Sequence, residues 1–453
     1  MRLFIAGMAY MVDQMKFQLI LLKILAFLLP FSVEIGVAPG SMLRVPTEPL
    51  IALAGCLLLM DVIRYPAKWK TFVFKEAVWV FPLLLVYVVT TVFSEIITVS
   101  VKFSLLNLLY ILVFYVYMIR VFRQYPRLFP QMLLFYGLGV MVVALWAIYQ
   151  FGQYDWNPVV ARGIFRPFYN DHTIFGASVA LLGVFWTAAA IFQANNRYLF
   201  FSLGVFFILA ALFSTSRAAF FSLFFAAAMY LVYLKRAKLH YILMILTVMI
   251  MVGVVFQKPI LERLHTVEVV SYGDNANFID RTVSVSNITT DVSNLERINR
   301  WVSAWRMFKE KPLTGFGPGT YQFTYIPYQD PAYMSRLTVT DPHDIPDGSG
   351  GTAHSEYLLA LSEMGVFGLL AWLLLIGRWF YVVFGLPREH PRIIYITVAF
   401  LALSTYLFHA LVNNFLATDK FAFLFWSTAA WMVANYHISA GSTMGRGLLN
   451  VKR

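Results

Sequence analysis

The chain is short of charge and of cysteine. Only 13% of its 453 residues are charged and 60% are hydrophobic, whereas about a quarter of the residues in a soluble domain carry charge. This composition excludes a water-soluble globular protein. The single cysteine, Cys56, excludes an intrachain disulfide framework and a cysteine-based zinc site. The net charge of +12 does not indicate a nucleic-acid partner, because basic loops follow from topology in a membrane protein.

Long apolar runs are abundant. A helix needs about 20 apolar residues to cross a bilayer, and twelve runs approach that length, although several are short. The first run lacks a small-residue cleavage site, so we expect a membrane anchor and not a cleaved signal peptide. The sequence predicts an all-α integral membrane protein with about twelve transmembrane helices, near residues 17–33, 48–63, 77–93, 103–119, 130–151, 173–194, 198–213, 218–234, 240–256, 357–384, 392–412 and 420–437.

Basic residues indicate the orientation of these spans. With both termini cytoplasmic, nineteen Lys and Arg residues fall on the cytoplasmic side. Six lie in the short outward loops, namely Arg44, Lys102, Arg162, Arg166, Arg217 and Lys420. We therefore expect a bundle of about nine helices over 1–256, one large outward loop domain over 257–354, and about three helices over 355–453.

Within the outward loop, apolar residues recur at helical spacing. They are Leu295, Ile298, Trp301, Trp305 and Phe308, and Pro312 with the turn Gly315–Gly319 ends the pattern. This spacing predicts an amphipathic helix at the outer boundary between membrane and water.

The outward arginines are candidates for binding an anion. Arg217 follows Ser214–Ser216 at a helix N-terminus, where free N–H groups and a guanidinium together suit a phosphate. Arg297 and Arg300 share one helix face and repel each other unless an anion lies between them. Arg162 and Arg166 add outward positive charge. The alternative for these arginines is contact with lipid head groups or solvent.

His354 is the outward histidine with the most distinctive setting, between a glycine-rich stretch and a helix that re-enters the membrane. Its imidazole can accept a proton near neutral pH, although such a histidine can also merely cap or pack. Asp419, at the outer end of the last span, is either functional at membrane depth or an N-cap. Asp341, Asp344, Asp347 and His343 could suggest a metal, but carboxylates in a Pro-rich loop favour solvation. We expect no metal and no cofactor.

The histidine lies in a recognisable motif. His354-Ser355, nine residues and then Gly365-Val366-Phe367-Gly368 resemble the histidine motif of bacterial O-antigen ligases. Polysaccharide polymerases and protein O-oligosaccharyltransferases are relatives of that family. Arg297 with Trp301, and the run from Met307 through Pro312 to Gly315-Phe316-Gly317, also resemble the family's stretch ahead of the histidine.

The resemblance implies a C-type glycosyltransferase (GT-C) fold in the bacterial inner membrane, with the active site on the periplasmic face. It implies a metal-independent, inverting transfer of a glycan from undecaprenyl pyrophosphate to lipid A-core. His354 matches the family's essential histidine, and Arg297 and Arg217 match its catalytic arginines. Arg300, Arg162, Arg166 and Asp419 are expected to contribute to substrate binding.

Three other functions remain open. The same donor and chemistry serve a polysaccharide polymerase or a protein O-oligosaccharyltransferase, which differ in the acceptor. A lipid or sugar transporter is a different class, but it predicts polar residues at the centres of the spans, whereas here they gather at outer ends and in one loop.

Overall fold

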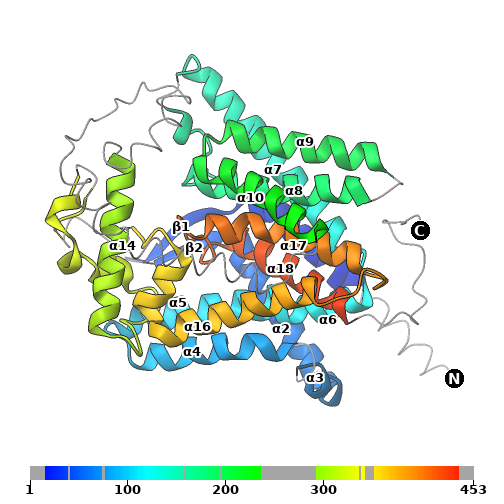
Figure 1. Ribbon diagram of the computed structural model, residues 1–453, viewed down its shortest axis with the longest axis horizontal. Helices are drawn as coiled ribbons and strands as arrows, with labels where there is room; N and C mark the ends of the chain where they lie inside the picture. Colours follow the sequence, from blue (N-terminus) through cyan, green and yellow to red (C-terminus); the bar gives the residue numbers. More distant parts are fainter. Residues whose placement is uncertain are drawn as a thin grey trace.

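The computed structural model describes residues 16–38, 41–73, 77–157, 160–192, 196–235, 292–335, 338–341 and 351–437. The described chain is mostly helical (Figure 1). Residues 16–28 are helical and are followed by η1 (Leu29–Phe31), β1 (Val33–Ala38), β2 (Ser41–Val45), α2 (Thr47–Arg64), α3 (Pro66–Phe72), η3 (Val78–Val80), α4 (Phe81–Val92), α5 (Ile97–Ile111), the π-helical η4 (Leu112–Tyr117), α6 (Met118–Gln124), α7 (Leu128–Gln153), η5 (Val160–Arg162), α8 (His172–Phe192), α9 (Arg197–Phe213), α10 (Arg217–Leu234), α14 (Val292–Glu310), α15 (Tyr321–Thr324), η6 (Ile326–Tyr328), η7 (Pro331–Tyr333), α16 (Glu356–Phe384), α17 (Ile393–His409) and α18 (Asp419–Tyr436).

The apolar runs of the sequence coincide with helical segments, except for 240–256, which lies outside the described residues. By length and composition, five described helices could cross a membrane, and a sixth if α2 and α3, bent by 105°, form one span. Three apolar helices are shorter, at Val78–Val92, Arg197–Phe213 and Ile393–His409. A helix rises 1.5 Å per residue, so these three fall short of a hydrocarbon core about 30 Å thick.

An antiparallel hairpin of β1 and β2 interrupts the helices, so the all-α prediction was wrong at this position. Glu34 and Arg44 face each other across the strands, and the Arg44 Nε donates to the Glu34 carboxylate over 3.1 Å. The sequence signal was hidden because β1 continues the first apolar run, and that run was assigned to a helix as far as Val33.

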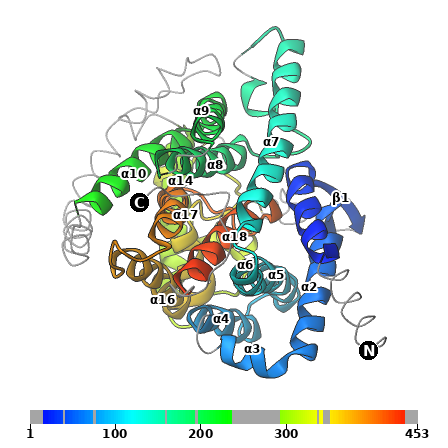
Figure 2. The ribbon, with the colours of Figure 1, turned by 90° about the vertical axis from the view of Figure 1, so that its right-hand side faces the viewer.

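The core of the molecule is built around α18. Every residue of this helix from Asp419 to Asn435 is buried, and Figure 2 shows α18 enclosed by the surrounding helices, with α17 and α6 beside it. Large aromatic rings fill the contacts, such as Trp372 stacked on Trp426 at 5.6 Å. Outer helices instead expose apolar side chains, such as Leu145 at 66%, as expected where lipid is the solvent.

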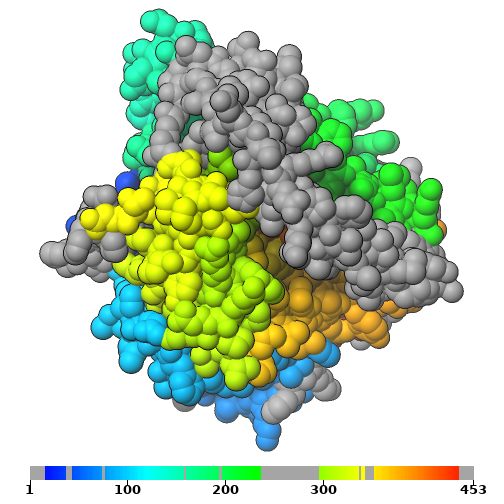
Figure 3. Space-filling model, turned by 60° about the vertical axis from the view of Figure 1, so that its left-hand side comes forward, coloured from blue at the N-terminus to red at the C-terminus, as the bar shows by residue number. Residues whose placement is uncertain are grey.

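At one end of the bundle, α14 stands beside the helix ends, at the left of Figure 1. Figure 3 shows that α14 and the segment after it form much of the surface there. The expected loop domain 257–354 is described from residue 292 onward, apart from 336–337 and 342–350.

The helix expected around Trp301 is confirmed as α14, but its buried face is not the aromatic one. The residues that pack inward are Leu295, Glu296, Asn299, Arg300, Ser303, Ala304 and Met307, while Trp305 is 47% exposed. The polar side chains on this face hydrogen-bond to the segment that follows α14. For example, the Asn299 Oδ1 accepts from the Asp330 N–H at 2.8 Å. Amphipathic spacing identified the helix, but it did not identify a polar buried face.

The turn after α14 is joined to α16. Gly365 has φ +65° inside α16 and breaks the helix there. The Gly317 N–H donates to the Glu363 carbonyl at 2.8 Å, and the Val366 N–H donates to the Pro312 carbonyl at 2.8 Å. The Glu363 carboxylate accepts from the Tyr321 N–H at 3.0 Å. The two glycine motifs noted in the sequence therefore form one structural unit that fixes α14 against the helix following His354.

Candidate functional site

His354 occupies the end of the short segment that leads into α16. Its φ of +48° lies in the left-handed region, which costs a non-glycine residue about 1–2 kcal/mol. Hydrogen bonds on both sides hold it there. The Trp301 Nε1 donates to the His354 carbonyl at 3.2 Å, and the His354 N–H donates to the Thr352 Oγ1 at 3.4 Å. Residues held in such conformations concentrate at functional sites.

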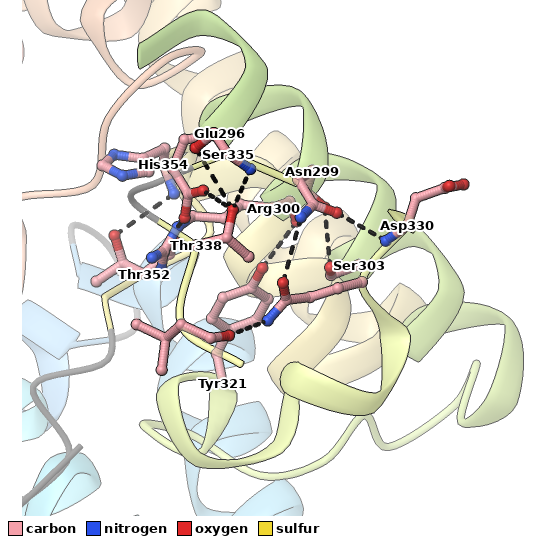
Figure 4. Close-up of polar contacts among 12 residues, drawn as sticks. Glu296, Asn299, Arg300, Ser303, Tyr321, Asp330, Ser335, Thr338, Thr352 and His354 are labelled. Carbon is pink, nitrogen blue, oxygen red and sulfur yellow. Dashed lines mark hydrogen bonds and ion pairs between the residues drawn. The ribbon is translucent and has the colours of Figure 1, made fainter. Parts of the chain in front are cut away.

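The imidazole of His354 is oriented by the loop between α17 and α18. It forms a side-chain hydrogen bond with Asn413. The Asn413 Nδ2 has no hydrogen-bond partner among the described residues, so this bond uses Oδ1, and a ring N–H of His354 donates to it. The other ring nitrogen then carries a lone pair. Figure 4 shows the imidazole pointing away from Asn299 and Ser303. This geometry is that of a base held in one tautomer by a neighbouring acceptor.

The electrostatic surroundings keep His354 neutral. Burial, together with the guanidinium groups of Arg297 and Arg300, lowers the pKa of His354 to about 3, although Asp171 and Asn413 act in the opposite direction. Arg297 and His354 therefore lie within range of each other's charge, and they come from different elements. A neutral imidazole beside a guanidinium can accept a proton while the guanidinium binds an anion.

Arg300 has different partners from those expected. Its Nε donates to the Glu296 carboxylate at 2.7 Å, its Nη1 donates to the Thr352 carbonyl at 3.2 Å, and it lies over the Tyr325 ring at 4.9 Å. The side chain is buried. Figure 4 shows it between α14 and the segment ahead of His354. These contacts give Arg300 a role in holding that segment, and its predicted contact with substrate stays a prediction.

Arg217 is the first residue of α10, as expected. Ser216 is the N-cap, and its Oγ accepts from the Ala219 N–H at 3.3 Å. The start of α10 packs against Gly176 of α8, where an added Cβ would lie 2.9 Å from the Ser216 Cβ. Gly176 is just over one turn from Asp171, whose charge acts on His354. The start of α10 therefore lies at the His354 end of the bundle.

The remaining site residues predicted from the sequence are not among the residues described above as contacting His354. Arg162 and Arg166 are exposed in the loop ahead of α8. Asp419 is 1% exposed at the start of α18, where it accepts a hydrogen bond from the Thr47 hydroxyl and lies 3.9 Å from Arg44. Asp419 is therefore a buried carboxylate paired with Arg44, and its predicted contact with substrate stays a prediction. Asp344, Asp347 and His343 lie outside the described residues.

Sequence reasoning missed the loop that carries Asn413. The Glu356 carboxylate holds this loop by accepting from the Phe415 N–H at 2.9 Å and the Leu416 N–H at 3.0 Å. The Thr352 Oγ1 donates to the Asn414 Oδ1 at 2.6 Å. His409 also lies nearby, since Arg297 and Asp171 act on its charge as they do on His354. The adjacent asparagines were the only signal in the sequence.

Comparison with known proteins gives one family. Residues 199–373 match the family model described as O-Antigen ligase. The match runs from α9 into α16 and includes Arg217, Arg297, Arg300 and His354. No curated protein matches the chain.

Proposed function

We propose that this chain, which carries a domain of the O-antigen ligase family, transfers a glycan from a polyprenyl pyrophosphate donor to an acceptor hydroxyl. The observation that supports this most is the placement of His354, held by Trp301, Thr352 and Asn413 within range of the Arg297 charge. A general base beside a fixed cation suits a reaction in which a hydroxyl loses a proton while a pyrophosphate leaves.

In the proposed reaction, the free ring nitrogen of His354 accepts the proton of the acceptor hydroxyl. The acceptor oxygen forms a bond to the anomeric carbon as the bond from that carbon to the pyrophosphate oxygen breaks, which inverts the anomeric configuration. The pyrophosphate leaves with the bonding electrons, and Arg297 and Arg217 stabilise its growing charge. The departing anion also offsets the positive charge near His354 and favours its protonation.

The donor expected for this family is undecaprenyl pyrophosphate carrying a glycan, and the acceptor is lipid A-core. We further propose that the fold is of the GT-C type, that the chain lies in the bacterial inner membrane, and that the His354 end faces the periplasm. The even number of expected spans and the bias of basic residues toward the other end support this orientation. In this orientation Arg162 and Arg166 would also face the periplasm and contact the outer part of the donor.

A reconstituted transfer assay tests the proposal. We expect His354→Gln to lower the rate of transfer about 10²–10⁴-fold, the usual contribution of a general base. His390→Gln is the matched control, because His390 lies in the turn between α16 and α17, away from α14, and it should retain full activity. Equal rates for His354→Gln and wild type would reject the catalytic role.

The acceptor is tested separately in a deletion strain. Accumulation of long glycan chains on the carrier lipid is expected for a ligase. Lipopolysaccharide capped by a single repeat unit would instead identify a polymerase, and a normal lipopolysaccharide profile would direct the search to a protein acceptor.

A further inference from the structure

A polar cavity lies away from the His354 site, where α2 bends into α3. It has a volume of about 250 Å³, and its lining includes Asp61, Arg64, Tyr65, Lys68, Tyr117 and Arg120. Figure 1 shows α3 at the lower right, away from α14 at the left. Three segments of the chain contribute to the lining. They are the N-terminal helix with Gln18, the bend between α2 and α3, and the stretch from Tyr117 to Tyr125. The proposed glycan transfer uses none of these residues.

The walls of this cavity carry excess positive charge. Among the described residues that line the cavity, three are cationic, namely Arg64, Lys68 and Arg120, and one is anionic, Asp61. The Arg120 Nε donates to Asp61 at 2.5 Å, and the Trp69 Nε1 donates to the same oxygen at 2.9 Å. Asp61 is thereby engaged by Arg120 and Trp69, and the lining keeps a net charge of two positive units, from three cations and one anion.

The cavity wall also contains a polar group without a partner. Tyr117 is 2% exposed, and its hydroxyl has no hydrogen-bond partner within the described part of the chain. A buried hydroxyl without a partner is destabilising, so an acceptor in the cavity would remove that penalty. Cations and a hydroxyl donor together suit the oxygen atoms of a phosphate.

The helix that supplies Asp61 and Arg64 also exposes apolar side chains outside the cavity lining. Leu59 and Ile63 of α2 are 61% and 77% exposed and lie beside the basic residues in the sequence. The cavity is smaller than the roughly 300–1,000 Å³ of sites for drug-sized ligands. It therefore has room for a head group but not for the chains of a lipid, which would lie along the exposed face of α2.

We infer that this cavity binds the phosphate of an anionic glycerophospholipid whose acyl chains lie along Leu59 and Ile63. The lipid would come from the leaflet on the basic side of the protein, where positive residues gather. Arg64 and Lys68 bind the phosphate, and the Tyr117 hydroxyl donates to it. The site would tie α3 to the membrane surface, whichever glycan the other end transfers.

The test is the apparent affinity of the purified full-length protein for phosphatidylglycerol, measured by native mass spectrometry. We expect Arg64→Gln with Lys68→Gln to weaken binding about thirtyfold, from the usual contribution of two basic residues near an anionic lipid. Tyr117→Phe, which removes only the hydroxyl, should weaken it about tenfold. Arg120 is left unchanged because its loss would leave Asp61 without its cation.

The matched control is Lys70→Gln with Arg388→Gln, which removes two positive charges outside the cavity lining. We expect it to leave the affinity within about threefold of wild type, since screened charges outside the cavity act weakly. An equal loss in both double variants would show general charge attraction and overturn the proposal. Displacement of the lipid by millimolar inorganic phosphate would overturn the lipid assignment in favour of a soluble anion.

Discussion

His354 is the residue whose surroundings are most specific. Its backbone conformation costs free energy, and groups from α14, from Thr352 and from the 410–418 loop hold it in place. A histidine that merely capped α16 would need none of these contacts, because Ser355 already caps the helix through its Oγ. The arrangement therefore favours the catalytic interpretation over the capping one.

The pH dependence of transfer follows from the pKa of His354. The active form is the neutral imidazole, and a pKa of about 3 keeps it neutral well below the ordinary value of 6.5. Activity is lost only as pH falls through the folded-state pKa. We therefore expect kcat/KM to stay level as pH falls from about 8 to about 5, since kcat/KM reports the free enzyme.

Arg297 should influence the acid limb of the pH profile, which is the pH range in which activity is lost as pH falls. Its positive charge lowers the pKa of His354, so Arg297→Gln should move the acid limb to higher pH in addition to weakening donor binding. Lys309→Gln is the control, because it removes an exposed positive charge from the same helix, α14. Coincident acid limbs for wild type and Arg297→Gln would contradict the electrostatic coupling.

Asn413 is a positioning residue in this scheme. Removing its carbonyl in Asn413→Ala should lower kcat about tenfold and leave the KM for the donor unchanged, because the imidazole loses its fixed tautomer. Asn413→Asp keeps an acceptor oxygen and adds a negative charge. It should restore part of kcat and move the acid limb upward. If both variants lose activity equally with no change in the pH profile, Asn413 acts only in folding.

At the scale of elements, the break in α16 connects the two glycine motifs. An added Cβ at Gly365 would lie 2.3 Å from the Leu313 carbonyl oxygen, at a φ of +65°. Gly365→Ala should therefore lower the free energy of unfolding by roughly 2–4 kcal/mol, from backbone strain and overpacking. It should also lower transfer activity, since the turn holds α14 against α16.

Gly377 provides the control within the same helix. It is exposed, and an added Cβ there meets nothing within 4 Å. Gly377→Ala should be neutral or stabilising by up to about 1 kcal/mol. Measuring the thermal unfolding midpoint and the transfer rate of both variants tests whether the break in α16 is required. Similar midpoints for Gly365→Ala and wild type would show that the break is not required.

The sequence could predict these elements but not how they meet. Apolar runs located the helices, and spacing located α14, because both signals are local. The motif also brought Arg297 and His354 into one region. Asn413 lies almost 60 residues beyond His354 and contacts it only because α16 and α17 return to the same end. Neither periodicity nor a motif reports such a tertiary contact.

Charge on a side chain did not reveal which groups it contacts in the fold. Arg300 was expected to bind substrate from its spacing to Arg297, yet Glu296, four residues earlier, accepts its hydrogen bond. Asp419 similarly meets Arg44 from the hairpin that sequence patterns did not reveal. Glu296 is a neighbour on the same helix, whereas Arg44 meets Asp419 only through the tertiary fold.

On the scale of the whole molecule, the distribution of basic residues predicts which end faces outward. The turn between α16 and α17 carries Arg388 and Arg392, while α14 stands at the other end (Figure 1). The positive-inside rule predicts that the basic turn is cytoplasmic. In a Cys56→Ser background, Lys309→Cys should react with a membrane-impermeant maleimide in spheroplasts, and Glu389→Cys should react only after permeabilisation. Both positions are exposed. If Glu389→Cys reacted in intact spheroplasts and Lys309→Cys did not, the protein would have the opposite orientation. That orientation would also place His354 on the wrong side of the membrane for a periplasmic acceptor.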